Sequence, residues 1–209
     1  MTIPVTCPVP NSNPKKKSTS TTELSLRIVG GKFRGHKIAY HGDPVTRPMK
    51  NRVREAIFNL VGPRVSQLHA IDLFAGTGAL GLEALSRGGL SATFVERHFP
   101  TANGIQKNID QLNVGQQSTL ARANVFAWMR DETHFPPAPW LILCSPPYDY
   151  FISENESMMK LIDRCLEVAA PESCIVLESD ARFETKRLPQ PTLWDVRHYP
   201  PATVSIFRK

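Results

Sequence analysis

Apolar residues from position 69 onward fall into two patterns, short continuous runs and longer segments in which they recur every three or four residues. The short runs predict strands over residues 69–74, 92–96, 118–125, 140–145 and 173–179. The longer segments predict helices over residues 79–88, 101–113 and 157–169, and residues 193–209 predict two more strands in an antiparallel pair. Strands that alternate with helices indicate an α/β protein, with a mostly parallel sheet covered on both faces.

The chain before residue 69 predicts a tail and a small extension. Residues 1–22 are rich in Pro, Ser, Thr and Lys and hold little to bury, which is typical of a disordered tail. Residues 24–40 alternate around a glycine pair and predict two short strands in a hairpin-like element. Residues 46–62 predict a helix with Pro48 in its first turn. We therefore expect three parts: a basic tail over 1–22, an N-terminal extension over 23–62 and a main domain over 63–209.

Positive charge is concentrated at the front of the chain, although the whole protein carries a formal net charge of only +6. Residues 1–60 hold 11 Lys and Arg residues against three acidic ones, whereas residues 61–209 hold 14 against 16. This asymmetry favours an N-terminal part that binds a polyanion, and solubility alone explains it equally well. The candidate contact residues are basic side chains of the hairpin and the first helix, Lys32, Arg34, Arg47, Arg52 and Arg54.

The composition, with 41% hydrophobic and 21% charged residues, is typical of a soluble globular protein. No apolar run approaches the ~20 residues that cross a bilayer, and the N-terminus lacks the apolar segment of a secretory signal. The four cysteines are scattered without the spacing of a metal or disulfide framework. We therefore expect a cytoplasmic protein with no membrane partner and no metal site.

A glycine-rich turn follows the first predicted strand of the main domain, where residues 72–81 read DLFAGTGALG. Its glycines let the backbone approach a ligand, and the helix that follows points N–H groups at that ligand. The turn satisfies GxGxxG, so a dinucleotide is one candidate ligand. Asp72, four residues before Gly76, is poorly placed beside a pyrophosphate but suits a positively charged cofactor with an amino-acid tail. Glu96 ends the next predicted strand, where an acid can hold the ribose hydroxyls of either ligand.

The same turn resembles the first motif of class I S-adenosylmethionine-dependent methyltransferases. This resemblance makes the following residues the expected cofactor-binding set: Asp72, Phe74, Ala75, Gly76, Thr77, Gly78 and Glu96. Asn124 is a further candidate, because its carbonyl oxygen can accept a hydrogen bond from the adenine amine. A loop-capping role for Asn124 is the alternative.

A second motif, Ser145-Pro146-Pro147-Tyr148, follows the predicted strand at 140–145. It resembles the (D/N/S)-P-P-(Y/F) signature of enzymes that methylate exocyclic amines of bases, which are poor nucleophiles because their lone pair is delocalised into the ring. The side chain of residue 145 and the Pro146 carbonyl can hold the N–H bonds of such an amine, and the two prolines fix the carbonyl's direction. Tyr148 offers a face on which the base can stack. An ordinary loop after a buried strand is the alternative.

Six segments together resemble the RsmD-like family, bacterial methyltransferases that modify the guanine N2 amine of small-subunit ribosomal RNA. They are RIVGGKFRGHKI (27–38), TRPMKNRVREAIFNLV (46–61), IDLFAGTGALGLEALSRG (71–88), FVE (94–96), SPPY (145–148) and IVLES (175–179). The resemblance covers about residues 25–209. It implies a class I, Rossmann-like methyltransferase fold, with a seven-stranded, mostly parallel sheet, an antiparallel last strand and a small N-terminal hairpin and helix extension.

The family resemblance also implies a chemistry for each part. It implies that residues 63–209 form the catalytic domain, which uses S-adenosylmethionine as cofactor and releases S-adenosylhomocysteine as product. It also implies that residues 23–62 form an RNA-binding extension. The motif Ser145–Tyr148 becomes the catalytic corner. Position 145 departs from the family, which usually has Asp there, and Ser is the variant found in amino-methyltransferases that act on cytosine.

The leading hypothesis is therefore methyl transfer from S-adenosylmethionine to a guanine N2 amine of 16S ribosomal RNA. The expected partner is small-subunit ribosomal RNA, free or within an assembling 30S particle, and the protein is expected to be a monomer. The alternative is a DNA or RNA amino-methyltransferase acting on adenine or cytosine, which Ser145 favours. An NAD-dependent oxidoreductase would use the glycine turn but leaves the SPPY motif and the basic extension unexplained. A non-catalytic RNA-binding protein also stays open.

Overall fold

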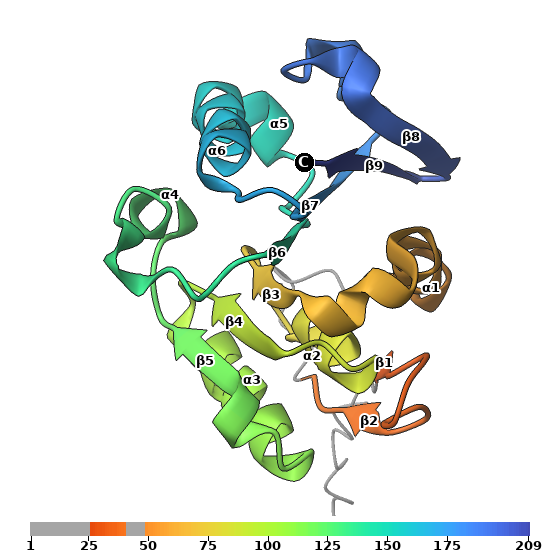
Figure 1. Cartoon of the computed structure of the whole chain (residues 1–209), viewed down its shortest axis with the longest axis vertical. Helices are drawn as coiled ribbons and strands as arrows, with labels where there is room; N and C mark the ends of the chain where they lie inside the picture. The colour runs from red at the N-terminus through yellow and green to blue at the C-terminus, as the bar shows by residue number, and fades with distance from the viewer. Residues whose placement is uncertain (1–25, 41–48) are drawn as a thin grey trace, which may run out of the picture.

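The computed structural model describes residues 26–40 and 49–209 of the 209-residue chain, and its main feature is a seven-stranded sheet (Figure 1). The strand order is β5-β4-β3-β6-β7-β9-β8. The first five strands in this order are parallel, and β9 is antiparallel to both of its neighbours. The strands are β3 (His69–Asp72), β4 (Ser91–Val95), β5 (Ser118–Ala121), β6 (Trp140–Cys144), β7 (Cys174–Asp180), β8 (Trp194–Tyr199) and β9 (Ala202–Arg208). The predicted seven-stranded sheet with an antiparallel end is confirmed.

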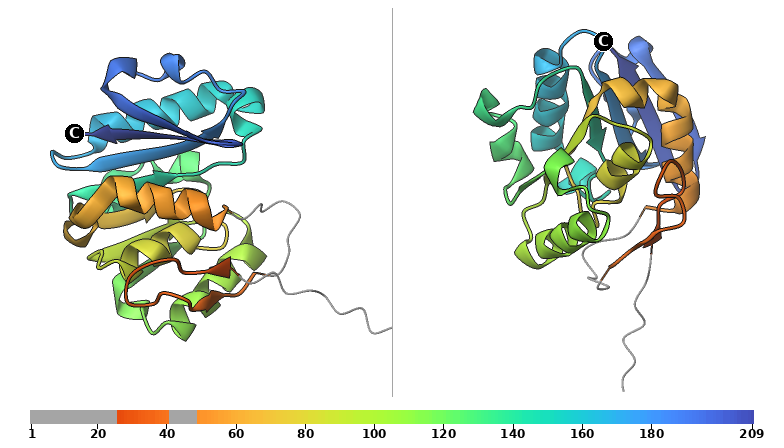
Figure 2. Two further views of the ribbon diagram at one scale, coloured as in Figure 1. Left: turned by 90° about the vertical axis from the view of Figure 1, so that its right-hand side faces the viewer. Right: turned by 60° about the horizontal axis from the view of Figure 1, so that its bottom comes forward.

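Helices cover both faces of the sheet (Figure 2). The sheet therefore separates two layers of hydrophobic core, one on each face. In β6, Leu141 and Leu143 belong to the layer under α1, α2 and α3, whereas Ile142 and Cys144 belong to the layer under α4, α5 and α6. This alternation is the two-residue period of a strand buried on both faces. The helices are α1 (Asn51–Val61), α2 (Ala79–Ser86), α3 (Phe99–Gln111), α4 (Val125–Trp128), α5 (Tyr150–Ser153) and α6 (Asn155–Val168).

The structure differs from the predicted elements mainly after β5. The strand predicted over residues 118–125 ends at Ala121, and α4 begins at Val125. The reason is local, because the Asn124 side chain accepts a hydrogen bond from the Phe126 N–H at 2.9 Å and so starts a helical turn. Helix α5 was not predicted, and Pro48 lies outside the described residues. Short 3₁₀ helices complete the chain at Gly62–Gln67, Gly115–Gln117, Glu132–His134, Thr185–Arg187 and Pro191–Leu193.

The N-terminal extension forms a two-stranded hairpin, β1 (Leu26–Arg27) and β2 (Lys37–Ile38), which docks on α2. The Val29 N–H donates to Oε2 of Glu83 at 2.9 Å, and the Phe33 N–H donates to Oγ of Ser86 at 2.9 Å. Apolar residues of the hairpin and of α1 lie in the same core layer as α2. The described part of the extension therefore shares its core with the sheet, and the predicted boundary at residue 62 stays a prediction.

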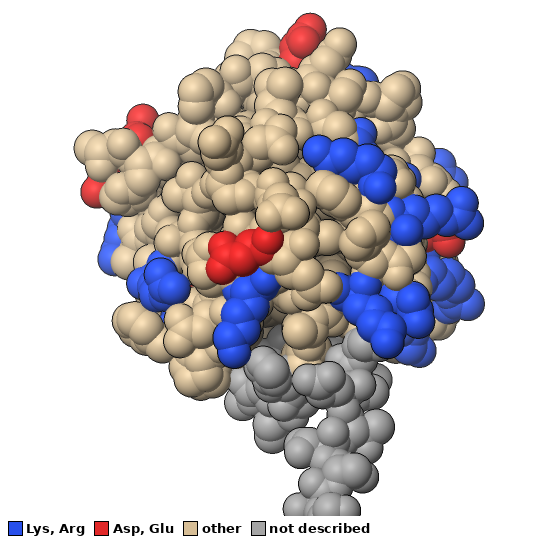
Figure 3. Space-filling view, turned by 90° about the horizontal axis from the view of Figure 1, so that it is seen from below, with Lys and Arg blue, Asp and Glu red and all other residues tan. Residues whose placement is uncertain are grey.

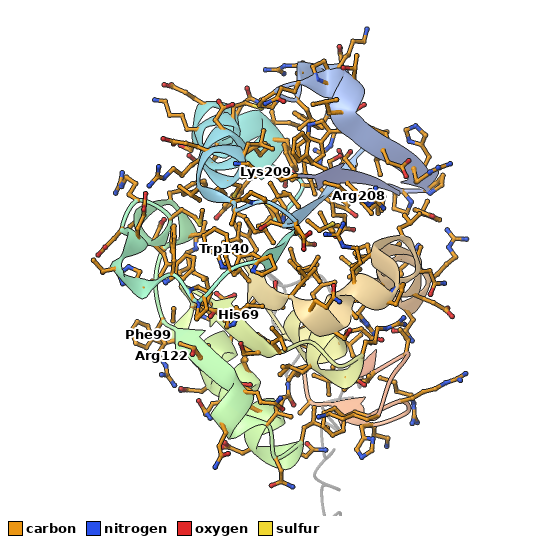
Figure 4. The ribbon with its side chains drawn as sticks, in the orientation of Figure 1. His69, Phe99, Arg122, Trp140, Arg208 and Lys209 are labelled. Atoms are coloured by element: carbon orange, nitrogen blue, oxygen red, sulfur yellow. The ribbon has the colours of Figure 1, made fainter. Side chains whose placement is uncertain are left out.

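The parallel strands place both chemical motifs at one edge of the sheet. His69 and Trp140 begin β3 and β6 and are paired in register, so these strands also end side by side (Figure 4). Asp72 ends β3, and Ser145 directly follows β6. Ligands of open α/β sheets bind at this carboxyl edge, where the strand order reverses, which here is between β3 and β6. No helix in the described ranges has the length and apolar character needed to cross a membrane.

Candidate functional site

A cavity of about 450 Å³ opens at the carboxyl ends of the parallel strands. The glycine-rich turn and the SPPY motif are about 70 residues apart in the sequence, and both line it. The predicted site residues that line the cavity are Asp72, Phe74, Ala75, Gly76, Thr77, Glu96, Asn124, Ser145, Pro146, Pro147 and Tyr148. The structure therefore brings the two motifs to one place. Gly78 is set back from the wall and precedes the first residue of α2.

The glycine-rich turn needs glycine for its backbone shape. Gly76 and Gly78 both have left-handed backbones, with φ values of 51° and 77°. The Gly78 N–H donates to the Ala75 carbonyl at 2.6 Å, which closes the turn immediately before α2. A Cβ atom on Gly78 would lie 3.2 Å from Cγ2 of Ile105, so α2 and α3 leave little space for a side chain. The turn can therefore present its backbone to a ligand in the cavity.

Asp72 brings a buried carboxylate to the cavity with one oxygen unpaired. Its side chain is 1% exposed, and Oδ2 accepts a hydrogen bond from the Gly81 N–H at 3.0 Å. Oδ1 has no hydrogen-bond partner among the described residues. Burial raises the pKa of Asp72 to about 7, although the Gly81 hydrogen bond acts in the opposite direction. A cationic ligand group beside Oδ1 would satisfy this oxygen and favour the ionised carboxylate.

Glu96 follows β4 and connects two loops of the site. Its Oε2 accepts from the Gly76 N–H at 2.9 Å, and its Oε1 accepts from the His98 N–H at 2.8 Å. Each carboxylate oxygen can accept a second hydrogen bond. The side chain is therefore held in place and still offers acceptors for a pair of ligand hydroxyls.

Three aromatic rings form a cluster in the wall of the cavity. Phe126 and Tyr150 are stacked with ring centroids 6.4 Å apart, and Phe74 lies edge-on to both. The guanidinium of Arg97 lies 5.7 Å from the Tyr150 ring centroid. Such a cluster suits a flat, heteroaromatic ligand group. Asn124, beside it, uses Oδ1 to cap α4, and its predicted contact with an adenine amine stays a prediction.

The SPPY corner is linked to a buried acid on the neighbouring strand, Glu178. The Ser145 hydroxyl donates to Oε2 of Glu178, and the Tyr148 hydroxyl donates to Oε1 at 2.7 Å. Glu178 is 4% exposed and also lines the cavity. Burial raises its pKa, and the two hydroxyl donors oppose that rise. The corner is therefore a three-residue hydrogen-bonded unit.

Comparison with known proteins identifies the family of the chain. The model of a family described as "Conserved hypothetical protein 95" matches residues 26–208, which is most of the sequence. The chain belongs to this family. The match agrees with the resemblance that the six sequence segments predicted.

Relatives of this family member carry methyltransferase names. Ribosomal RNA small subunit methyltransferase D of Escherichia coli K12 is 40% identical over 114 residues, which are 54% of this chain and 57% of that relative. The alignment therefore spans little more than half of that relative's length. The protein of the same name from Haemophilus influenzae is 28% identical over 181 residues, 86% of this chain and 90% of its own.

A solved structure supports the fold. It is the Thermus thermophilus 16S rRNA N2 G1207 methyltransferase (RsmC) in complex with AdoMet and guanosine, with a TM-score of 0.67 and 17% sequence identity. The superposition covers 90% of this chain and 50% of that one. At this identity the likeness concerns the fold, which is that of class I methyltransferases.

The basic residues predicted for this family member divide into exposed and buried ones. Lys32, Arg34 and Arg52 are exposed, and Arg47 lies outside the described residues. The prediction that Arg54 faces a nucleic acid is wrong, because its side chain is 0% exposed. Figure 3 shows Lys and Arg gathered on the side of the molecule where Figure 1 draws α1 and the hairpin.

Arg54 is buried because it lies on the face of α1 that packs against α2. Its Nε lies 3.4 Å from Oε2 of the equally buried Glu83, and its Nη2 donates to Oδ1 of Asn51 at 2.9 Å. Burial lowers the pKa of Arg54, and the neighbouring Glu83 opposes that shift. This residue therefore joins the extension to the main domain instead of facing solvent.

Sequence reasoning missed three residues of the site, Phe126, Tyr150 and Glu178. Phe126 and Tyr150 come after predicted strands, and Glu178 lies near the end of one, all at the site edge of the sheet. Glu178 had a detectable signal, because it is an acid next to the end of the mostly apolar strand predicted over residues 173–179. The strand register pairs Cys144 with Leu177, so Ser145 and Glu178 come next and lie side by side. The contact between Glu178 and Ser145 can be predicted only if β6 and β7 are known to be neighbours in the sheet.

Proposed function

We propose that the protein transfers a methyl group from S-adenosylmethionine to the exocyclic N2 amine of a guanine in 16S, small-subunit ribosomal RNA. The observation that carries this proposal is the meeting of the glycine-rich turn and the SPPY corner in one cavity. The names of the Escherichia coli and Haemophilus influenzae relatives support a small-subunit RNA substrate. The Thermus thermophilus neighbour, a 16S rRNA N2 methyltransferase, supports the guanine amine.

The residues of the turn fit the cofactor. Asp72 would hold the ammonium of its amino-acid part, because Oδ1 is buried and lacks a partner among the described residues. Glu96 would accept from the ribose hydroxyls, and the Phe126–Tyr150 pair would contact the adenine. When bound, S-adenosylmethionine supplies an electrophilic methyl group on a positively charged sulfur.

The SPPY corner suits the guanine amine that would accept the methyl group. The amine of guanine becomes nucleophilic when its N–H bonds are held by acceptors and its lone pair points at the methyl carbon. Ser145 Oγ and the Pro146 carbonyl would be those acceptors, and the prolines keep the carbonyl in place. The Tyr148 ring would stack on a base that has left its helix.

The exposed basic residues of the hairpin and α1 fit the RNA backbone. Lys32, Arg34 and Arg52 would contact phosphates and give an affinity that falls as salt rises. Replacing Arg34 with Ala should lower the slope of log affinity against log salt by about 0.7–1. Lys160→Ala, an exposed residue of α6 that pairs with Glu156, is the matched control and should leave the slope unchanged.

Nucleoside mass spectrometry of the product tests the proposed reaction. Purified protein and labelled S-adenosylmethionine are incubated with naked 16S RNA, with 30S particles from a strain that lacks the related methyltransferase, and with DNA. We expect N2-methylguanosine in one or both RNA samples, and the comparison shows which form is the substrate. Label found only in DNA would contradict the proposal.

The alternative acceptor is an adenine or cytosine amine, which Ser145 favours because Ser is the variant used on cytosine. The same spectrum decides, since N6-methyladenosine or N4-methylcytidine would replace N2-methylguanosine. An NAD-dependent reaction is tested by calorimetry, in which we expect S-adenosylhomocysteine to bind and NAD not to bind.

A further inference from the structure

Glu178 lines the part of the cavity formed by Ser145, Pro146, Pro147 and Tyr148, which we call the acceptor half. The part lined by the glycine-rich turn, Glu96 and the aromatic cluster is the cofactor half. No sequence motif gave Glu178 a function. Strand register brings it beside Ser145, and both carboxylate oxygens accept hydrogen bonds, one from Ser145 and one from Tyr148. Glu178 is 4% exposed and lines the cavity together with Ser145 and Tyr148. A buried acid that touches two residues of the motif calls for a chemical explanation.

The hydrogen-bond direction at Ser145 supplies that explanation. A hydroxyl has one proton to donate and two lone pairs that accept. Because Ser145 gives its proton to Glu178, only the lone pairs remain for a ligand in the cavity. A Ser145 without this partner could point its O–H at the amine nitrogen and occupy the lone pair that must attack the methyl carbon.

We propose that Glu178 is the positioning residue for the methyl-accepting amine, acting through Ser145, which it holds as a hydrogen-bond acceptor toward the cavity. This inference rests on the proposed function. Glu178 thereby does through one hydroxyl what the Asp usual at position 145 in the RsmD-like family does directly. The departure at Ser145 then no longer argues for a different base, because the pair Ser145–Glu178 presents the same acceptor.

The same pair gives the reaction's proton a destination. The amine lone pair forms the bond to the methyl carbon, and the electron pair of the broken carbon–sulfur bond stays on sulfur. The methylated amine then loses one proton to the Ser145 oxygen, while the Ser145 hydroxyl proton passes to Glu178. Glu178 releases that proton to water after the product leaves. Burial raises the pKa of Glu178, which suits a group that must hold a proton briefly.

Three variants test the proposal by methyl transfer to the RNA. Glu178→Leu removes the acceptor of both hydroxyls, and kcat should fall by roughly 10- to 100-fold, as for a lost charge-assisted hydrogen bond. Glu178→Gln should lose less, because its amide oxygen can still accept from Ser145. Ser145→Asp/Glu178→Gln returns a carboxylate to the corner, and kcat should recover to within about threefold of the native value, a coupling that independent sites would not show.

A binding measurement tests the same idea without catalysis. Guanosine and inosine differ only in the 2-amino group, so their affinities in the presence of S-adenosylhomocysteine report the contact with the amine. Native protein should prefer guanosine by about 2- to 10-fold, the range for one neutral hydrogen bond. Glu178→Leu should bind both nucleosides equally. Each variant should show a cooperative thermal unfolding transition, and its S-adenosylhomocysteine affinity should match that of the native protein.

The outcomes separate this inference from the proposed function. If native protein methylates no base in RNA, the proposed function is wrong. If it methylates guanine and the Glu178 variants are as active as native, with the guanosine preference intact, only the role of Glu178 is wrong. A double variant as inactive as Glu178→Leu, although it is folded and binds S-adenosylhomocysteine, also contradicts that role.

Discussion

The two halves of the cavity satisfy their buried acids in different ways. In the cofactor half, Asp72 accepts a single backbone hydrogen bond and leaves Oδ1 without a partner among the described residues. In the acceptor half, both oxygens of Glu178 accept from side-chain hydroxyls, those of Ser145 and Tyr148. The first acid thus keeps one oxygen available to a ligand, whereas the second has both oxygens paired with side-chain hydroxyls.

Burial raises the pKa of both acids, and to about 7 for Asp72. One backbone N–H, that of Gly81, opposes the rise at Asp72, and two hydroxyl donors oppose it at Glu178. In the proposed function, a cationic group of the cofactor beside Asp72 would relieve an unfavourable buried charge, and this relief would contribute to the cofactor's affinity. The acceptor half gains little from binding alone, and its organisation favours the transfer step. Variants of the first half should change affinity, and variants of the second should change rate.

The largest expected effect is that of Asp72→Asn on cofactor affinity. The amide keeps the shape but cannot pair with an ammonium group, so S-adenosylhomocysteine should bind roughly 10- to 100-fold more weakly by calorimetry. The ligand-free variant should unfold at a higher temperature than native protein at pH 8, because a buried unpaired charge is gone. An unchanged affinity would remove the distinction between the two halves.

The pH dependence of the native protein is the next largest effect. The folded pKa of Asp72, about 7, is above its ordinary value of 3.8, so the native state binds the extra proton between these values. Asp72 therefore contributes a fall in the free energy of unfolding of the ligand-free protein as pH rises through this window, whereas His69, whose pKa burial lowers to about 4, contributes a rise. Affinity for S-adenosylhomocysteine should change in the opposite direction, falling by up to about tenfold for each pH unit below 7. The contribution of Asp72 to both dependences should be absent in Asp72→Asn, so the difference between native protein and variant, measured by thermal unfolding and calorimetry, isolates it.

The contrast also shows what the sequence could and could not predict. In the cofactor half, the residues of the glycine-rich turn follow one another in a single motif and line the cavity as expected, whereas Phe126 and Tyr150 come from other segments and were not predicted. In the acceptor half the sequence predicted Ser145 and Tyr148 but not Glu178, because the contact joins strands whose adjacency becomes known only from the sheet order. The prediction that Arg54 contacts RNA was wrong for a related reason. Its helical position places it on the inner face of α1, and its partner Glu83 lies on another helix.

A smaller effect is expected from Glu96→Gln, a second variant of the cofactor half. The amide oxygen can replace one carboxylate oxygen as the acceptor for Gly76 or His98 but not both, and neutral hydrogen bonds are weaker than charged ones. Affinity for S-adenosylhomocysteine should fall by about 3- to 10-fold, with kcat at saturating cofactor unchanged. A fall in kcat alone would place Glu96 with the acceptor half instead.

The smallest effect is expected from Tyr148→Phe. This variant separates the contribution of the Tyr148 ring from that of its hydroxyl. The ring remains to stack on the base, so KM for the RNA should stay near the native value, whereas Tyr148→Ala should raise it.

Glu178 loses the donor at Oε1, which normally lowers its pKa, so its pKa should rise further in the Phe variant. Because Glu178 holds Ser145 as an acceptor only when it is ionised, kcat on the acid side of the pH–rate profile should fall by about 2- to 10-fold. The acid limb of the pH–rate profile should move to higher pH, and the loss should shrink as pH rises and Glu178 becomes ionised in both proteins. A pH-independent loss would mean that Tyr148 acts on the base directly and not through Glu178.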